Sequence, residues 1–215
     1  MIGRVQYISQ SNAQGDHLDH IQRIVESGGD WVQLRVKDRS EAEVKELAIQ
    51  AKELCSKTGT QLIINDFPHI AAEVKADGVH LGKNDLAPKL AREMVGPDMI
   101  IGGTANTFED IEYLADQGVN YIGLGPFRFT TTKKNLSPVL GHEGYRNLIS
   151  QARDRGIHIP IIAIGGILLE DVPELMKTGI HGIALSGLIT HAESPSALIS
   201  QLQTLTQDET VGNRR

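Results

Sequence analysis

Residues 40–66 read SEAEVKELAIQAKELCSKTGTQLIIND and contain one full repeat of the pattern that decides the fold. Ser40 and Glu43 have the spacing of a capping box, in which two side chains satisfy backbone N–H groups at a helix start. The predicted helix, residues 41–56, has one apolar face made of Val44, Leu47, Ala48, Ala51, Leu54 and Cys55. Gly59 suits the left-handed position that ends a helix, and the run QLIIN that follows is typical of a strand buried on both faces.

The same order of helix, glycine and short apolar strand recurs along the chain. We expect eight strands, at Val5–Ser9, Trp31–Val36, Gln61–Asn65, Gly78–Leu81, Ile100–Gly103, Tyr121–Leu124, Pro160–Ile164 and Gly182–Leu185. Eight β/α units predict an α/β fold, a single (β/α)8 TIM barrel over residues 1–207, and 215 residues require its helices to be short. The alternative is an open doubly wound sheet, but evenly spaced units without a break favour the barrel.

Two further helix starts are marked, and the end of the chain carries no pattern. Thr107 is followed by Asp110 at capping distance, and Ser194 is followed by Pro195, a cap and a first-turn proline. Residues 208–215 read DETVGNRR, and we expect them to form a disordered tail.

The overall composition argues against several classes of protein. The net charge is −6 and only 4% of residues are aromatic, which disfavours a nucleic-acid partner. No apolar run reaches the roughly 20 residues of a membrane span, and the start of the chain has no apolar signal segment. The single cysteine, Cys55, cannot form an internal disulfide. We therefore expect a cytoplasmic protein that has neither nucleic-acid nor membrane partners; its oligomeric state stays open.

The active site of a barrel lies at the C-terminal ends of its strands, and the second predicted strand ends in cations. Gln33, Arg35 and Lys37 alternate along this strand, so their side chains point to one side. If that side is the interior, Arg35 and Lys37 form an anion clamp. The alternative is a solvated strand edge, but two inward cations without a ligand would be costly in a strand buried on both faces.

Two carboxylates follow the next strands. Asp66 follows strand 61–65, and Asp85 lies in the loop after strand 78–81. Such a pair can hold Mg²⁺ and leave coordination positions for phosphate oxygens and water. The alternatives are a helix cap for Asp66, because Pro68 follows, and an ordinary turn for Asp85.

The later strands indicate a second anion site. Gly165-Gly166 and Ser186-Gly187 follow the last two strands, where barrels often bind phosphate through backbone N–H groups. The polar segment RFTTTKKNLSP, residues 128–138, has the length of a lid. The alternatives are a pair of tight turns and a merely solvated loop. His80 ends a strand, where it could pack or cap, and no zinc motif or nucleophile motif is present.

Together the motifs resemble the thiamine phosphate synthase family in order and spacing, from about residue 33 to residue 186. They are QLRVK, INDFPHIA, ADGVHLGKNDL, GGTANT, YIGLGPFRFTTTKKN, AIGGI and GIALSG. The resemblance implies a Mg²⁺-dependent transferase that joins a pyrimidine pyrophosphate to a thiazole phosphate, plain or carboxylated, and releases pyrophosphate.

The resemblance also implies a role for each matching residue. The pyrimidine pyrophosphate would be bound by Gln33, Arg35, Lys37, Asn65, Thr104 and Lys133, of which Arg35, Lys37 and Lys133 would act in catalysis. The thiazole phosphate would be bound by Thr130, Thr131, Thr132, Gly166, Leu185 and Ser186. Asp66 and Asp85 would bind Mg²⁺, the one cofactor.

The chain departs from the family pattern at a few positions, and two alternative functions compete with that of the family. Val36 replaces a common Glu, Lys83 a common Gln, and the Leu185-Ser186 turn is one residue short. A thiazole tautomerase-like relative would lack the two aspartates and would have a histidine where Pro126 stands. A non-catalytic binder of thiamine-type phosphates would need no metal pair.

Overall fold

The computed structural model describes residues 1–129 and 138–207, which form a closed barrel of eight parallel strands in sequence order. The strands are β1 (Val5–Ile8), β2 (Trp31–Leu34), β3 (Gln61–Asn65), β4 (Gly78–Leu81), β5 (Ile100–Ala105), β6 (Tyr121–Leu124), β7 (Ile161–Ile164) and β8 (Gly182–Leu185). Pairing of β1 with β8 closes the cylinder. The predicted TIM barrel is therefore confirmed, and the open doubly wound sheet is excluded.

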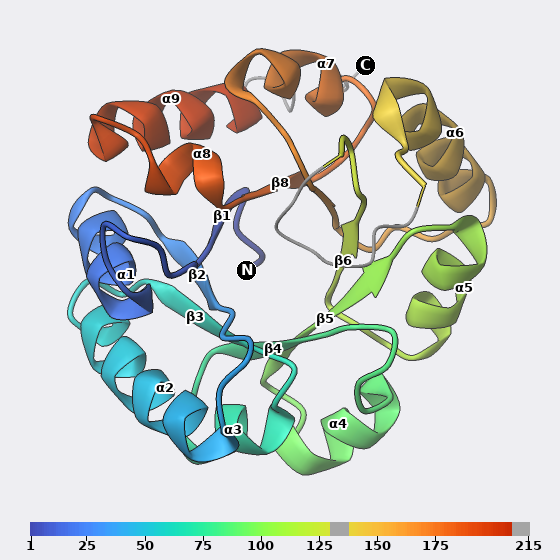
Figure 1. Ribbon diagram of the computed structural model, residues 1–215. Helices are drawn as coiled ribbons and strands as arrows, with labels where there is room; N and C mark the ends of the chain where they lie inside the picture. The colour runs from blue at the N-terminus through green and yellow to red at the C-terminus, as the bar shows by residue number, and fades with distance from the viewer. Residues whose placement is uncertain (130–137, 208–215) are drawn as a thin grey trace.

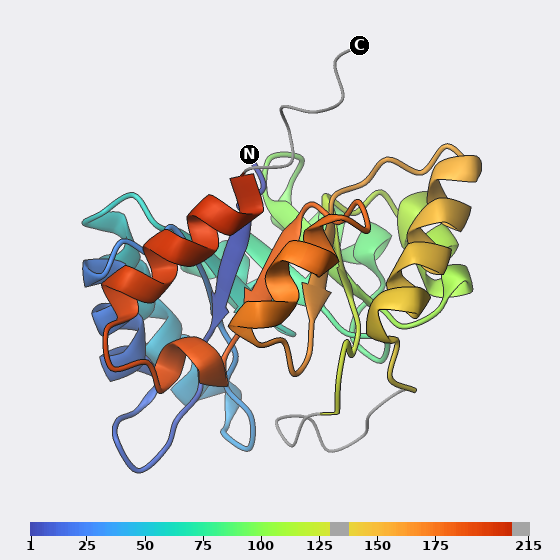
Figure 2. The same cartoon turned by 90° about the horizontal axis from the view of Figure 1, so that it is seen from above.

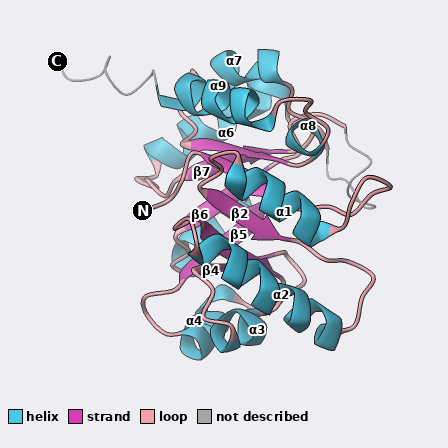
Figure 3. Cartoon of the chain, turned by 90° about the vertical axis from the view of Figure 1, so that its left-hand side faces the viewer, coloured by secondary structure: helices cyan, strands magenta, loops and turns pink. Residues whose placement is uncertain are grey.

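A ring of helices surrounds the barrel (Figure 1). They are α1 (His17–Glu26), α2 (Glu41–Ser56), α3 (Pro68–Glu73), α4 (Pro88–Val95), α5 (Phe108–Asp116), α6 (Gly141–Asp154), α7 (Val172–Met176), α8 (Gly187–Thr190) and α9 (Pro195–Gln207). Several are short, as the chain length requires. Figure 3 shows α1 and α2 side by side on one flank of the barrel. No described helix is long and apolar enough to cross a membrane.

The helix starts follow the predicted capping chemistry. The Glu43 N–H donates to Ser40 Oγ at 3.4 Å, and the Ser40 N–H donates to Glu43 Oε2 at 2.9 Å. Thr107 and Asp110 form the same reciprocal pair at α5. The predicted strand β2, in contrast, ends two residues early, at Leu34. Its next N–H, on Arg35, donates to the side chain of Ser9 at 3.1 Å instead of continuing the ladder.

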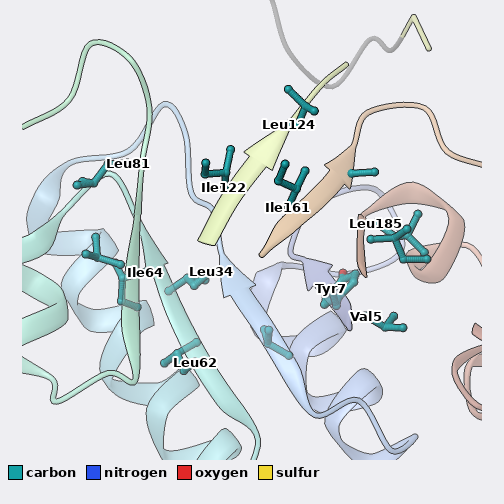
Figure 4. Close-up of a cluster of buried hydrophobic side chains, with 14 of the residues drawn as sticks. Val5, Tyr7, Leu34, Leu62, Ile64, Leu81, Ile122, Leu124, Ile161 and Leu185 are labelled. Carbon is teal, nitrogen blue, oxygen red and sulfur yellow. The ribbon is translucent and has the colours of Figure 1, made fainter. Parts of the chain in front are cut away.

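Side chains alternate between two apolar layers because successive residues of a strand point to opposite faces. The outward layer packs the strands against the helices and includes Leu34, Leu62, Ile64, Ile122 and Leu185 (Figure 4). A smaller layer fills the interior: Ile8, Trp31, Ile63, Tyr121, Ile162 and Ala184. The barrel is thus a packed core, and its open end supplies the space for a site.

The two ends of the described chain meet at one end of the barrel. The Arg4 guanidinium donates to the carbonyl oxygens of Thr206 at 2.9 Å and His181 at 3.1 Å. Figure 2 shows α9 lying along the barrel wall beside β1. The predicted tail, residues 208–215, lies outside the described residues.

Candidate active site

The cationic end of β2 extends from the barrel interior to its mouth. Gln33 is 2% exposed, Arg35 is half-buried and Lys37 is exposed. Burial lowers the pKa of Arg35, and the negative charge of Asp66 opposes this shift. The intervening Val36 packs into the outer core, so the residue that departs from the family pattern faces away from the cations. Arg35 and Lys37 lie just beyond the strand, and both interact with the negative charge of Asp66.

The two aspartates lie close enough to interact. Asp66 forms an ion pair with Lys37 and has a φ of 70°, a left-handed conformation that non-glycine residues seldom adopt. Burial and the neighbouring charge of Asp66 raise the pKa of Asp85. The Asp85 carboxylate also accepts a hydrogen bond from the Gly82 N–H at 2.6 Å. The pair therefore concentrates negative charge that a cation would neutralise.

The structure separates the alternatives for these aspartates. Phe67, not Asp66, is the N-cap of α3, so the helix-cap interpretation of Asp66 is wrong. Asp85 does organise its own turn, and it faces Asp66 as well. Within residues 1–129 and 138–207, no three His, Cys, Asp or Glu side chains gather as a ready metal cluster. A divalent cation here would take two carboxylates and its other oxygens from substrate and water.

Asn65 and Thr104 lie on the interior side of the same mouth. Asn65 is buried, and its Nδ2 has no hydrogen-bond partner among the described residues, which leaves a donor for a ligand. Thr104 is on β5, which extends two residues beyond its predicted end. A cavity of about 270 Å³ lies between Thr104 and Asp85 and reaches α4 and α5. Lys83, another departure from the family, borders this cavity and forms an ion pair with Asp110 at 2.5 Å.

The opposite rim is formed after β7 and β8. Gly165 and Gly166 have φ values of 97° and 66°. A Cβ on Gly166 would lie 2.9 Å from the carbonyl oxygen of Phe129, so only glycine fits this turn without displacement. The Ser186 hydroxyl donates to Gln10 Oε1 at 3.1 Å, while Leu185 is buried at the end of β8.

The polar segment at residues 128–138 is only partly described. Thr130, Thr131, Thr132 and Lys133 lie outside the described residues. Arg128, just before them, donates to Asp171 through both terminal nitrogens, at 2.8 and 2.9 Å, and to the Gly166 carbonyl oxygen at 2.6 Å. The sequence places Arg128 only in a polar loop. Its contacts with Asp171 and the glycine turn cannot be predicted from local sequence, because Asp171 lies 43 residues away.

The sequence predicts only a packing or capping role for His80, whereas both nitrogens of its ring form hydrogen bonds in the barrel interior. Its Nε2 hydrogen-bonds to Thr104 Oγ1 at 3.0 Å, and its Nδ1 to the Tyr121 hydroxyl at 3.0 Å. Its carbonyl oxygen accepts from the Asp66 N–H at 2.9 Å. The alternation of strand 78–81 could have indicated that the His80 side chain points inward.

A parallel eight-stranded barrel with cations, paired carboxylates and a glycine turn at one mouth has the architecture of a TIM-barrel enzyme. Comparison with known proteins gives the family. The family model described as thiamine monophosphate synthase matches residues 5–189. The chain belongs to this family.

Individual relatives agree. The chain is 48% identical over 202 residues to a thiamine-phosphate synthase of Flavobacterium johnsoniae, covering 94% of this chain and 95% of that one. It is 49% identical over 191 residues to one of Bacteroides fragilis, covering 89% and 94%. A solved thiamine phosphate pyrophosphorylase of Pyrococcus furiosus has a TM-score of 0.81 at 26% identity, covering 94% and 95%. The predicted family and transferase type are confirmed.

Proposed function

We propose that this chain condenses 4-amino-2-methyl-5-(diphosphooxymethyl)pyrimidine with 4-methyl-5-(2-phosphoethyl)thiazole to give thiamine phosphate and pyrophosphate; with the carboxylated form of the thiazole, CO2 would be released as well. The observation that carries the proposal is the pair Arg35 and Lys37 beside the pair Asp66 and Asp85. A diphosphate leaving group needs cations on its oxygens, and a divalent cation needs the carboxylates.

The reaction requires no protein nucleophile. The C–O bond at the pyrimidine methylene breaks, and its electron pair leaves with pyrophosphate. The ring nitrogen of the thiazole then donates its lone pair to that carbon, forming the C–N bond and a thiazolium cation. Arg35 and Lys37, with Lys133 from the segment outside the described residues, would stabilise the charge that grows on the leaving oxygen. Holding both substrates in line would lower the barrier further.

Mg²⁺ at Asp66 and Asp85 would supply Lewis-acid stabilisation of the leaving pyrophosphate. The ion pair between Lys37 and Asp66 suggests how the site is kept neutral before substrate binds. With Mg²⁺ held by Asp66 and Asp85, the Lys37 ammonium would be free to pair with a phosphate oxygen.

The thiazole phosphate would bind on the opposite rim. The backbone at Gly166, Leu185 and Ser186 offers N–H groups, and glycine permits a close approach of the ligand. Thr130, Thr131 and Thr132 would add hydroxyl donors. The partners are small molecules, and the cytoplasmic location expected from the sequence stays a prediction.

One experiment tests the proposal directly. Purified protein is incubated with both substrates and Mg²⁺, and thiamine phosphate and pyrophosphate are measured. We expect equal amounts of both products, and none in excess chelator until Mg²⁺ is restored. Full activity in chelator would overturn the metal assignment, and ligand binding without pyrophosphate release would identify a non-catalytic binder.

A further inference from the structure

Five polar side chains from five strands form one continuous hydrogen-bonded chain across the barrel interior. The Gln33 amide donates to Gln6 Oε1 at 3.2 Å, and the Gln6 amide donates to the Tyr121 hydroxyl at 3.4 Å. That hydroxyl lies 3.0 Å from His80 Nδ1, and His80 Nε2 lies 3.0 Å from Thr104 Oγ1. The chain therefore connects Gln33 and Thr104, the two ends that face the proposed pyrimidine pyrophosphate site.

The interior is built to accommodate this chain. Gln6 and Tyr121 are each 1% exposed, so their polar atoms have no access to bulk water. A Cβ on Gly102 would lie 2.2 Å from the Tyr121 ring, and one on Gly123 would lie 3.1 Å from the His80 ring. Glycines at these two strand positions make room for the rings. Burial of polar groups is costly unless each finds its partner, and here the partners are other members of the chain.

The donors and acceptors define a direction. The Tyr121 hydroxyl accepts from the Gln6 amide, and its single proton is then available to His80 Nδ1. Burial raises the pKa of Tyr121, so the phenol keeps that proton. With Nδ1 accepting, the ring proton of His80 is on Nε2 and points at Thr104 Oγ1.

The direction decides what the two ends offer to a ligand. Because Thr104 Oγ1 accepts from His80, its own hydroxyl proton is left to be donated into the mouth. Because the Gln33 amide nitrogen donates to Gln6, its carbonyl oxygen is left as an acceptor. If every bond ran the other way, Thr104 would turn a lone pair toward a phosphate anion and Gln33 would present an N–H. The direction that follows from the two amide orientations suits an anionic oxygen at Thr104 and an amine at Gln33.

We propose that Gln6, Tyr121 and His80 are positioning residues that set this direction, so that Thr104 donates to the pyrophosphate and Gln33 accepts from the ring amine. The ligand assignment rests on the proposed function, whereas the direction of the chain does not. Tyr121 is the central residue, because its hydroxyl joins the two amides to the His80–Thr104 pair.

The first test reads the His80 tautomer by ¹⁵N NMR of histidine-labelled, ligand-free protein. We expect the proton on Nε2 and none on Nδ1. His80→Gln identifies the resonance by its loss, and if that variant does not fold, Thr104→Val identifies it by its shift. A proton on Nδ1 would overturn the proposed direction. This result stands whether or not the protein makes thiamine phosphate.

The second test compares two buried tyrosines. Tyr121→Phe removes the central hydroxyl. Tyr7 is also buried, at 2% exposed, but its hydroxyl is bonded to Thr190 at 2.9 Å and lies outside the hydrogen-bonded chain, so Tyr7→Phe is the control. We expect Tyr121→Phe to raise KM for the pyrimidine pyrophosphate about tenfold, with KM for the thiazole phosphate unchanged. Tyr7→Phe should change neither KM. Identical KM values in the two variants would mean that the hydrogen-bonded chain only helps to pack the barrel interior, and would overturn the positioning role.

The same comparison works without turnover. If the wild-type protein binds the substrates without reaction, the proposed function fails. The affinity for inorganic pyrophosphate, measured by calorimetry, then takes the place of KM. Tyr121→Phe should then bind pyrophosphate about tenfold more weakly than Tyr7→Phe. Equal affinities of the two variants would overturn the positioning role on their own.

Discussion

Asp85 shows at the scale of one residue how a binding site costs stability. Its carboxyl is half-buried beside Asp66, and both burial and that charge raise its pKa. The folded state therefore holds the Asp85 proton more tightly than the unfolded state does. The contribution of Asp85 to the free energy of unfolding is largest below the ordinary Asp pKa and falls as pH rises through the raised value. At neutral pH the ionised carboxylate destabilises the protein, and the proposed cation would offset this effect.

Asp85→Asn should consequently stabilise the cation-free protein at neutral pH while it reduces activity. An asparagine oxygen can still accept from the Gly82 N–H, and the repulsion from Asp66 disappears. The gain in unfolding free energy should be about 1 kcal/mol or less, because water screens the pair. The kcat/KM should fall by about 100-fold with the metal ligand lost. Urea denaturation and steady-state kinetics measure the two effects, and a variant as active as wild type would leave Asp85 as a turn residue only.

Thr132 and Lys133 lie outside the described residues, and the family resemblance assigns these neighbours to different substrates. Loss of a hydroxyl bonded to phosphate costs about 1–3 kcal/mol, so Thr132→Ala should raise KM for thiazole phosphate roughly tenfold. Charge on the leaving group grows as the bond breaks, so Lys133→Ala should lower kcat more than it weakens binding. The same kinetic signature in both variants would contradict the division of this loop between two substrates.

At the residue scale, the sequence predicts site residues that follow a strand better than it predicts polar residues inside a strand. Arg35, Asp66 and Asp85 could be found because they interrupt an apolar pattern at a strand end. Gln6 and Tyr121 could not, because a polar residue within a strand gives no sign of its partner, and their partners come from strands distant in sequence.

Helix starts are the elements that local sequence predicts best, since a capping box involves only four residues. Ser40→Ala removes the side chain that caps α2, and the free energy of unfolding should fall by about 1 kcal/mol. Ser56→Ala, the same substitution at the exposed last residue of α2, is the control and should be close to neutral. Urea denaturation of both variants measures the difference, and equal stabilities would mean that the cap contributes nothing.

The strand ends were predicted less well, for a physical reason. β2 stops at Leu34 because the side chain of Ser9, the residue that follows β1, takes the next N–H. β5 continues to Ala105 because β6 pairs with it that far. Both limits depend on contacts between strands, which periodicity along one strand does not contain.

At the scale of the whole molecule, the barrel has a closed sheet and one continuous outer core, so its melting should be a single transition. Ligand binding should therefore raise the Tm of that transition. Mg²⁺ with pyrophosphate at about 100 times Kd should add about 2.7 kcal/mol. In a domain of this size that is a rise of roughly 5–10 °C in Tm. Differential scanning fluorimetry checks this, with Asp66→Asn as the variant that should lose the rise. An equal rise with pyrophosphate alone would argue against a metal at Asp66 and Asp85.

The hydrogen bond from Arg4 to Thr206 places the first strand and the last helix together at the end of the barrel opposite the mouth. A short peptide could join these ends, and the chain could begin elsewhere. Gly118, in the turn between α5 and β6, has a φ of 71° and open space around it. A circularly permuted gene opened at this turn would start at β6 and encode the same cylinder. Its proposed site would then be assembled in a different order during synthesis, with the glycine turn made before the aspartate pair and Thr104 on β5 made last.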